Sequence, residues 1–154
     1  MTPADLREEV AIELDAMELV VEELLALQQD VVERGATVRE KTAAAAFLAQ
    51  FYNGLENILK RISRFHQVPL PTGETWHVEL FQRFTPPSYP ELPPLFDTTL
   101  ATTLAPYRRF RHVAFHSYGF QLDWERMAAG IEQIEDVFTQ IKRSLFTYLA
   151  SIDP

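Results

Sequence analysis

Apolar side chains recur at intervals of three or four residues along most of this chain, which is the pattern of helices that bury one face. One such stripe consists of Leu6, Val10, Leu14, Met17, Val21, Leu24 and Val31. A second consists of Phe47, Phe51, Leu55, Ile58, Ile62 and Phe65. A third consists of Trp124, Met127, Ile131, Ile134, Phe138, Ile141, Leu145 and Leu149. No stretch alternates apolar and polar residues over a useful strand length, so the chain is predicted to be all-α.

Capping residues mark where the first two helices begin and end. Thr2 suits the N-cap of the first helix, with Pro3 at its first position, and Gly35 suits a left-handed C-terminal stop. Thr37 and Glu40 then have the spacing of a capping box that starts the second helix. Because only a short turn separates them, these two long helices are predicted to fold back as an antiparallel hairpin.

Prolines and capping residues divide the second half of the chain. A short helix is predicted at about 75–84, and the five prolines within 85–96 exclude a helix there. A fourth helix is predicted over about 98–117, with Gly119 as its C-terminal cap, and a fifth begins after Asp123. The expected fold is an antiparallel bundle of four long helices plus one short helix.

Length and composition limit the class of protein. The 154 residues suit a single helical domain over 1–154, and the absence of cysteine excludes disulfides and zinc–thiolate sites. No run of about 18 apolar residues is present, so no membrane span is expected. The first nine residues lack the apolar core of a signal peptide. A cytoplasmic protein is the simplest expectation.

The negative charge is concentrated at one end. Residues 1–34 hold ten acids against two bases, which accounts for the whole formal charge of −8. The remaining 120 residues are balanced and can still present basic patches. The composition therefore argues against a tight, nonspecific nucleic-acid binder. It leaves room for an enzyme that contacts RNA locally, or for an acidic face that meets a basic partner.

The most informative chemical motif is Arg111-x4-His116-x-Tyr118, near the end of the predicted fourth helix. A guanidinium binds phosphate oxygens bidentately, and an imidazole transfers protons near neutral pH. Cleavage of RNA by its 2′-hydroxyl needs a base, an acid and stabilisation of charge at phosphorus. The motif therefore predicts phosphodiester cleavage, with Arg111 as phosphate clamp and His116 as general acid or base.

Helical geometry leaves the arrangement of this motif open. On an ideal helix, Arg111 and His116 are about 140° apart, whereas Arg111 and Tyr118 share a face. His112 and His116 also share a face. Either the helix loosens before Gly119, or two copies of the motif complete the site across a dimer.

The motif and its surroundings resemble the HepT-type ribonuclease toxins of the HEPN superfamily. Besides Arg111, His116 and Tyr118, the resemblance rests on segments 51–59, 76–80 and 122–126. It therefore covers most of the chain and implies a HEPN-like, HepT-like fold.

This resemblance also implies a function. It implies a toxin that cleaves RNA without metal as a homodimer, paired with a nucleotidyltransferase antitoxin of the MNT type in a toxin–antitoxin system. By position, Arg111 and His116 become the catalytic pair, and Tyr118 becomes the tyrosine that the antitoxin modifies by AMPylation. His112 fills the polar position that follows the arginine in many members. The implied homodimer favours a site completed by two copies of the motif.

Other polar residues near the motif have alternative interpretations. Arg108 and Arg109 are candidate RNA contacts, and the alternative for them and for Arg111 is a solvated face of ordinary surface charges. Glu56 either supports a motif residue or faces solvent. His112 and His116 have a metal-ligand spacing, but no HExxH glutamate lies between them. No metal and no other cofactor is therefore expected.

The remaining histidines and a basic cluster are expected outside the site. His66 is interpreted as a cation at the end of the second helix, and His77 as a packed surface residue beside Trp76. The cluster of Lys60, Arg61 and Arg64 is interpreted as a solvated face, with RNA contact as the alternative.

Two other functions are compatible with the sequence. The first is a non-catalytic accessory or nucleotide-binding subunit of a nucleotidyltransferase, which would use the same cleft without cleaving RNA. The second is a plain dimerisation module, which explains the core but leaves the motif unexplained. The complete set of Arg111, His116 and Tyr118 favours the ribonuclease.

Overall fold

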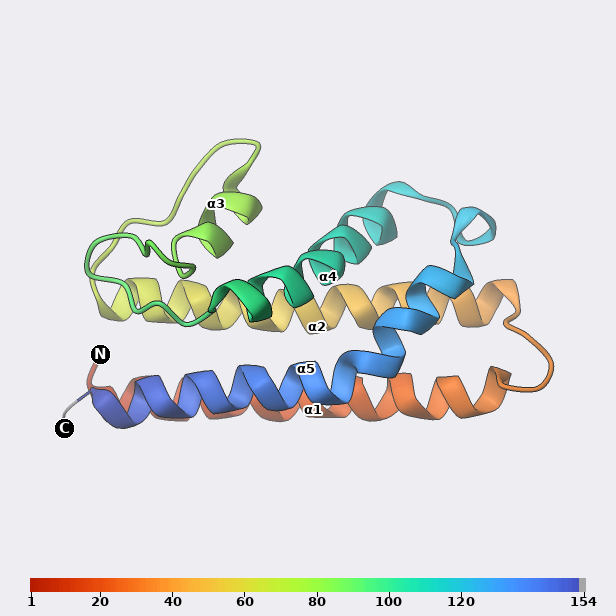
Figure 1. The fold of residues 1–154 in the computed structure, drawn as a ribbon, viewed down its shortest axis with the longest axis horizontal. Coiled ribbons are helices and arrows are strands. Elements are labelled where there is room, and N and C mark those ends of the chain that lie inside the picture. The colour runs from red at the N-terminus through yellow and green to blue at the C-terminus, as the bar shows by residue number, and fades with distance from the viewer. Residues whose placement is uncertain (153–154) are drawn as a thin grey trace.

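The computed structural model describes residues 1–152 and contains five α-helices joined by loops and one short 3₁₀ turn (Figure 1). The elements are α1 (Pro3–Val31), α2 (Val38–Phe65), α3 (Trp76–Gln82), α4 (Thr98–His116), η1 (Gly119–Gln121) and α5 (Trp124–Ser151). Four long helices and one short helix, with no strand among the described residues, confirm the predicted all-α bundle.

The α1–α2 hairpin forms as its capping residues predict. The Thr2 hydroxyl accepts a hydrogen bond from the backbone N–H of Asp5, whose carboxylate accepts in return from Thr2. Gly35 lies in the left-handed region, with a φ of 79°. Thr37 and Glu40 form the second capping box at the start of α2. Local hydrogen bonds therefore fix both helix starts and the turn between them.

The central helix of the bundle is α2, which contacts α1, α3, α4 and α5 (Figure 1). In this view it lies between a layer made by α1 and α5 and a layer made by α3 and α4. The ring of Phe51 is fully buried and meets the rings of Tyr107 on α4 and Phe138 on α5. Side chains on the α4-facing side of α2 therefore belong to a helix that is packed against its neighbours.

Helix α5 bends part-way along its length (Figure 1). Gly130 lies in this helix, and its carbonyl accepts a hydrogen bond of 2.6 Å from the Tyr107 hydroxyl of α4. Gly130 also permits the close approach of α4, because a Cβ there would lie 2.6 Å from the Phe110 ring.

The end of α4 differs from the sequence prediction. The helix ends at His116, and Ser117 is extended, with φ −128° and ψ 148°. Gly119 was predicted to be the C-terminal cap of this helix, but it starts the 3₁₀ turn η1 instead. Its function is steric, because a Cβ at Gly119 would lie 2.2 Å from the Thr42 hydroxyl oxygen on α2.

His66 also differs from its interpretation as a helix-end cation. Its Nε2 lies 2.6 Å from the Tyr148 hydroxyl on α5, and burial lowers the pKa of its imidazole. Burial therefore favours the neutral ring, which packs α2 against α5. Along residues 1–152, no helix has the length and apolar character that crossing a membrane requires.

Candidate functional site

Arg111 is anchored in the structure by two residues of α2. Its Nε donates a hydrogen bond of 2.7 Å to the Asn53 side-chain oxygen. The same nitrogen lies 3.4 Å from Glu56 Oε1. Asn53 and Glu56 are three residues apart on α2, so one helix face presents both. With its Nε engaged in this way, the guanidinium is held in a fixed orientation.

Glu56 is the buried centre of this group. Only 3% of the residue is exposed, and its second oxygen lies 2.6 Å from Nδ1 of His77 on α3. The carboxylate therefore links Arg111 and His77, and the guanidinium supplies the charge partner that a buried carboxylate needs. The sequence left two interpretations of Glu56 open, support of a motif residue or a side chain that faces solvent. The contact of Glu56 with Arg111 matches the first interpretation.

Arg111 and His77 border a groove between α3 and α4. It has a volume of about 390 Å³ and is lined by Glu74, Thr75, His77, Val78, Arg108, Arg109, Arg111, His112 and Val113. Three arginines against one carboxylate make the lining electropositive. The groove therefore suits an anionic ligand whose charge is concentrated in phosphate groups.

Arg108 extends this surface toward the proline-rich loop. It also lines a neighbouring hollow of about 660 Å³ together with Pro86, Pro87 and residues of α3 and α4. Its guanidinium lies 5.7 Å from the centre of the Phe81 ring. The loop over 85–96 therefore borders the surface that continues from the groove.

Tyr52 lies directly before Asn53 and is buried. Burial raises the pKa of its phenol well above the ordinary value, and the nearby Glu56 charge adds to this rise. Arg108 and Arg111 oppose the rise without cancelling it. The Tyr52 phenol therefore keeps its proton and stays neutral near pH 7.

His116 and Tyr118 do not line the groove that contains Arg111. The rings of His112 and His116 lie 4.4 Å apart, so His112 connects His116 to the groove. Tyr118 lies beyond the end of α4, is 71% exposed and stacks on the ring of Phe120. Because α4 ends before Tyr118, the helical angle between Tyr118 and Arg111 does not apply.

Residues 43–152 match the sequence model of a family described as HepT-like protein. The matched segment covers most of the chain and includes Asn53, Glu56, His77 and the whole Arg111–Tyr118 motif. The chain belongs to the HepT-like family. The resemblance drawn from the motif is therefore confirmed at the level of the family. The HepT-like family is in general one of HEPN ribonuclease toxins, so RNA is its general class of target.

No curated protein and no solved structure gave a significant match to the chain.

The sequence interpretation of this HepT-like chain missed two residues of the groove region. Asn53 was noted only as part of the segment 51–59, and His77 was interpreted as a packed surface residue. Trp76 does pack on His77, with ring centres 3.4 Å apart, but His77 also contacts Glu56 and lines the groove. The sequence signal that could have identified Asn53 is that it is a polar residue on a helix face that is otherwise buried.

Two residues of the basic cluster on α2 contact side chains that do not line the groove. Arg61 lies 3.1 Å from both Glu9 and Glu13 on α1, and Lys60 lies over the Trp76 ring. Among residues 1–152, no three His, Asp or Glu side chains gather as metal ligands would.

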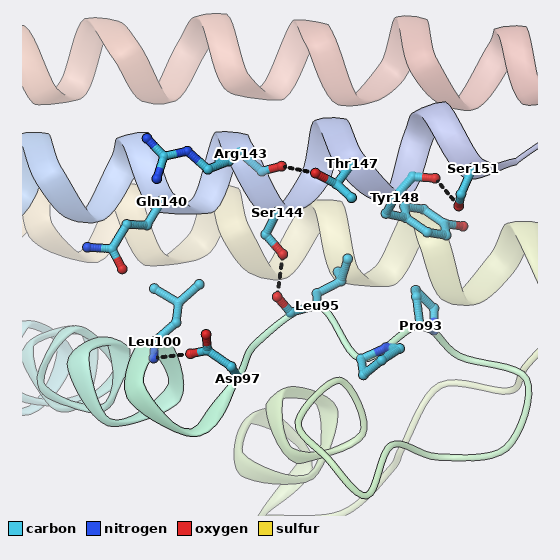
Figure 2. Close-up of a pocket in the computed structure, with 11 residues that line it drawn as sticks. Pro93, Leu95, Asp97, Leu100, Gln140, Arg143, Ser144, Thr147, Tyr148 and Ser151 are labelled. Atoms are coloured by element: carbon cyan, nitrogen blue, oxygen red, sulfur yellow. Dashed lines mark hydrogen bonds between the residues drawn. The ribbon is translucent and has the colours of Figure 1, made fainter.

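A separate cavity lies near the C-terminal end of α5, where Pro93, Leu95, Asp97 and Leu100 face side chains of that helix (Figure 2). The Ser144 hydroxyl donates to the Leu95 carbonyl across it. Other hydroxyls in its wall donate to carbonyls of α5 itself (Figure 2). None of the predicted site residues lines this cavity, and the hydroxyls of Ser144, Thr147 and Ser151 in its wall already donate to backbone carbonyls.

Proposed function

We propose that this HepT-like protein is the toxin of a HEPN/MNT toxin–antitoxin system, and that it cleaves RNA without a metal ion. The observation that carries the proposal is the anchored guanidinium of Arg111 in an electropositive groove. Since Asn53 and Glu56 engage its Nε, both terminal nitrogens are left for two oxygens of one phosphate. Arg108 and Arg109 supply further contacts to the RNA backbone.

His116 supplies a proton-transfer group from a second protomer. Within one chain His116 does not line the groove that contains Arg111, so a two-fold axis near the end of α4 would bring it to the partner's groove. Phe115 and Phe120 are exposed apolar residues beside the motif, and such a surface is typical of an interface. A homodimer of this kind would both complete the catalytic set and bury this apolar surface.

The first test is incubation of the purified protein with cellular RNA in EDTA, beside Arg111→Ala and His116→Ala. We expect cleavage by the wild type and loss of about 10²–10⁴-fold in each variant, since each removes a charge or proton-transfer group. Arg143→Ala on α5 serves as control, because it lies away from the groove.

This function would be contradicted by a folded, unmodified wild type that binds RNA or nucleotides but does not cleave RNA. It would favour the accessory or nucleotide-binding subunit instead. Cleavage that disappears in EDTA would contradict the metal-independent mechanism.

Tyr118 is the proposed site of AMPylation by the MNT nucleotidyltransferase antitoxin. Its side chain is exposed and lies outside the helix, so a second enzyme can reach the hydroxyl. We expect intact-mass spectrometry after co-expression with the antitoxin to show added AMP on the wild type and none on Tyr118→Phe. Tyr89→Phe is the matched control, because Tyr89 is also exposed. AMP that remains on Tyr118→Phe would refute the assignment.

A further inference from the structure

His77 lines the same groove as Arg111 and is joined to it through one buried carboxylate. Its Nδ1 lies 2.6 Å from Glu56 Oε2, and Glu56 Oε1 lies 3.4 Å from Arg111 Nε. The imidazole is partly exposed, so it is accessible from the groove. The three residues come from α3, α2 and α4 and form a chain of contacts that leads from a phosphate clamp to an imidazole.

We propose that His77 is a catalytic residue of this site, the general base that takes the proton from the attacking 2′-hydroxyl of RNA. The proposal rests on the ribonuclease function argued above and assigns a residue to the base that this reaction needs. In one protomer His77 lies in the groove with Arg111, whereas His116 does not.

The hydrogen bond to Glu56 selects the form of the ring that a base requires. A carboxylate only accepts hydrogen bonds, so Nδ1 of His77 donates and carries the proton. In the neutral ring, Nε2 then has a free lone pair that can accept a proton. The Trp76 ring lies against His77, and Lys60 lies over Trp76, so packing also restricts rotation of the imidazole.

The reaction balances with these groups. Nε2 of His77 takes the 2′-hydroxyl proton while the O2′–P bond forms and the P–O5′ bond breaks. His116 of the second protomer donates a proton to the departing O5′ atom. The products are a 2′,3′-cyclic phosphate and a 5′-hydroxyl. The Glu56 carboxylate then stabilises the imidazolium of His77, and Arg111 binds the charged oxygens of the phosphorane.

A purely structural explanation makes a different prediction. If His77 only links α3 to α2, then any side chain that donates to Glu56 should replace it without loss of activity. Asparagine can place an N–H near the position of Nδ1 but has no group that accepts a proton in the position of Nε2. His77→Asn therefore separates the two explanations.

The test measures kcat and KM for an RNA oligonucleotide in EDTA with wild type, His77→Asn, Arg111→Ala and His66→Asn. We expect His77→Asn to keep the thermal midpoint and KM of the wild type and to lose about 10²–10⁴-fold in kcat. His66→Asn is the matched control, since His66 also bonds a side chain of another helix but lies outside the groove. It should keep wild-type kcat.

A second variant covers the case in which His77→Asn misfolds. In His77→Gly, added imidazole should occupy the space beside Trp76 and restore kcat in proportion to its concentration, with no effect on Arg111→Ala. A structural link would not be rescued in this way.

The experiment distinguishes failure of the His77 assignment from failure of the ribonuclease function. If Arg111→Ala is inactive while His77→Asn loses less than about 10-fold in kcat, the base assignment is overturned and the ribonuclease function stands. Absence of imidazole rescue in a folded, inactive His77→Gly would likewise overturn the assignment. If the wild type itself does not cleave RNA, both proposals fall.

Discussion

Arg111→Lys is expected to lose RNA cleavage by about 10²–10³-fold, although it keeps the positive charge. In the structure, Nε of Arg111 is engaged by Asn53 and Glu56, which leaves the two terminal nitrogens for phosphate. Lysine has a single ammonium group, so it cannot contact the two α2 residues and clamp two phosphate oxygens in one fixed plane. The loss should appear mainly in kcat, because the clamp acts on charge that develops in the transition state.

The measurement is steady-state cleavage of an RNA oligonucleotide, with circular dichroism to verify the fold. Arg143→Lys on α5 is the matched control, because it makes the same chemical change outside the groove. Cleavage by Arg111→Lys within a few-fold of the wild type would mean that a point charge suffices. The anchoring by Asn53 and Glu56 would then have no catalytic consequence.

The largest expected effect on stability is that of Phe51→Ala, at about 3–5 kcal/mol. Phe51 is 0% exposed, and its ring centre lies 5.6 Å from that of Tyr107 and 5.9 Å from that of Phe138. Its removal leaves a cavity where α2, α4 and α5 meet, and two aromatic contacts are lost with it. Because domains are stable by only about 5–15 kcal/mol, this is a large share of the total.

Urea unfolding followed by circular dichroism gives the free energy of unfolding for this comparison. Phe146→Ala on α5 is the matched control, since Phe146 is 55% exposed and its loss should change stability by no more than about 0.5 kcal/mol. Equal effects of the two substitutions would show that Phe51 does not join the three helices.

The limits of the sequence interpretation are clearest at the end of α4. The residue types of the motif were evident, but the helical wheel placed Tyr118 on the face of Arg111. In the structure Ser117 is extended, and Gly119 lies against Thr42 of α2. A contact between segments nearly 80 positions apart therefore decides where Tyr118 lies, and no local pattern reports such a contact.

The groove shows what the sequence can predict, because four of its polar lining residues lie on one helix. Arg108, Arg109, Arg111 and His112 were all singled out from the sequence, and all four line it. Their nearness follows from one helix, where spacing alone predicts proximity. Whether they act on RNA stays a proposal, as do the catalytic roles of Arg111 and His116.

The sequence by itself determined the helices and the chemical types at the motif. Apolar periodicity and the caps at Thr2, Gly35 and Thr37 act within a few residues, so they can be read without knowing the fold. Only the tertiary structure decided that Glu56 joins Arg111 to His77. These three side chains lie on three helices, and they meet because α2 buries its apolar faces against its neighbours, which is a property of the whole bundle.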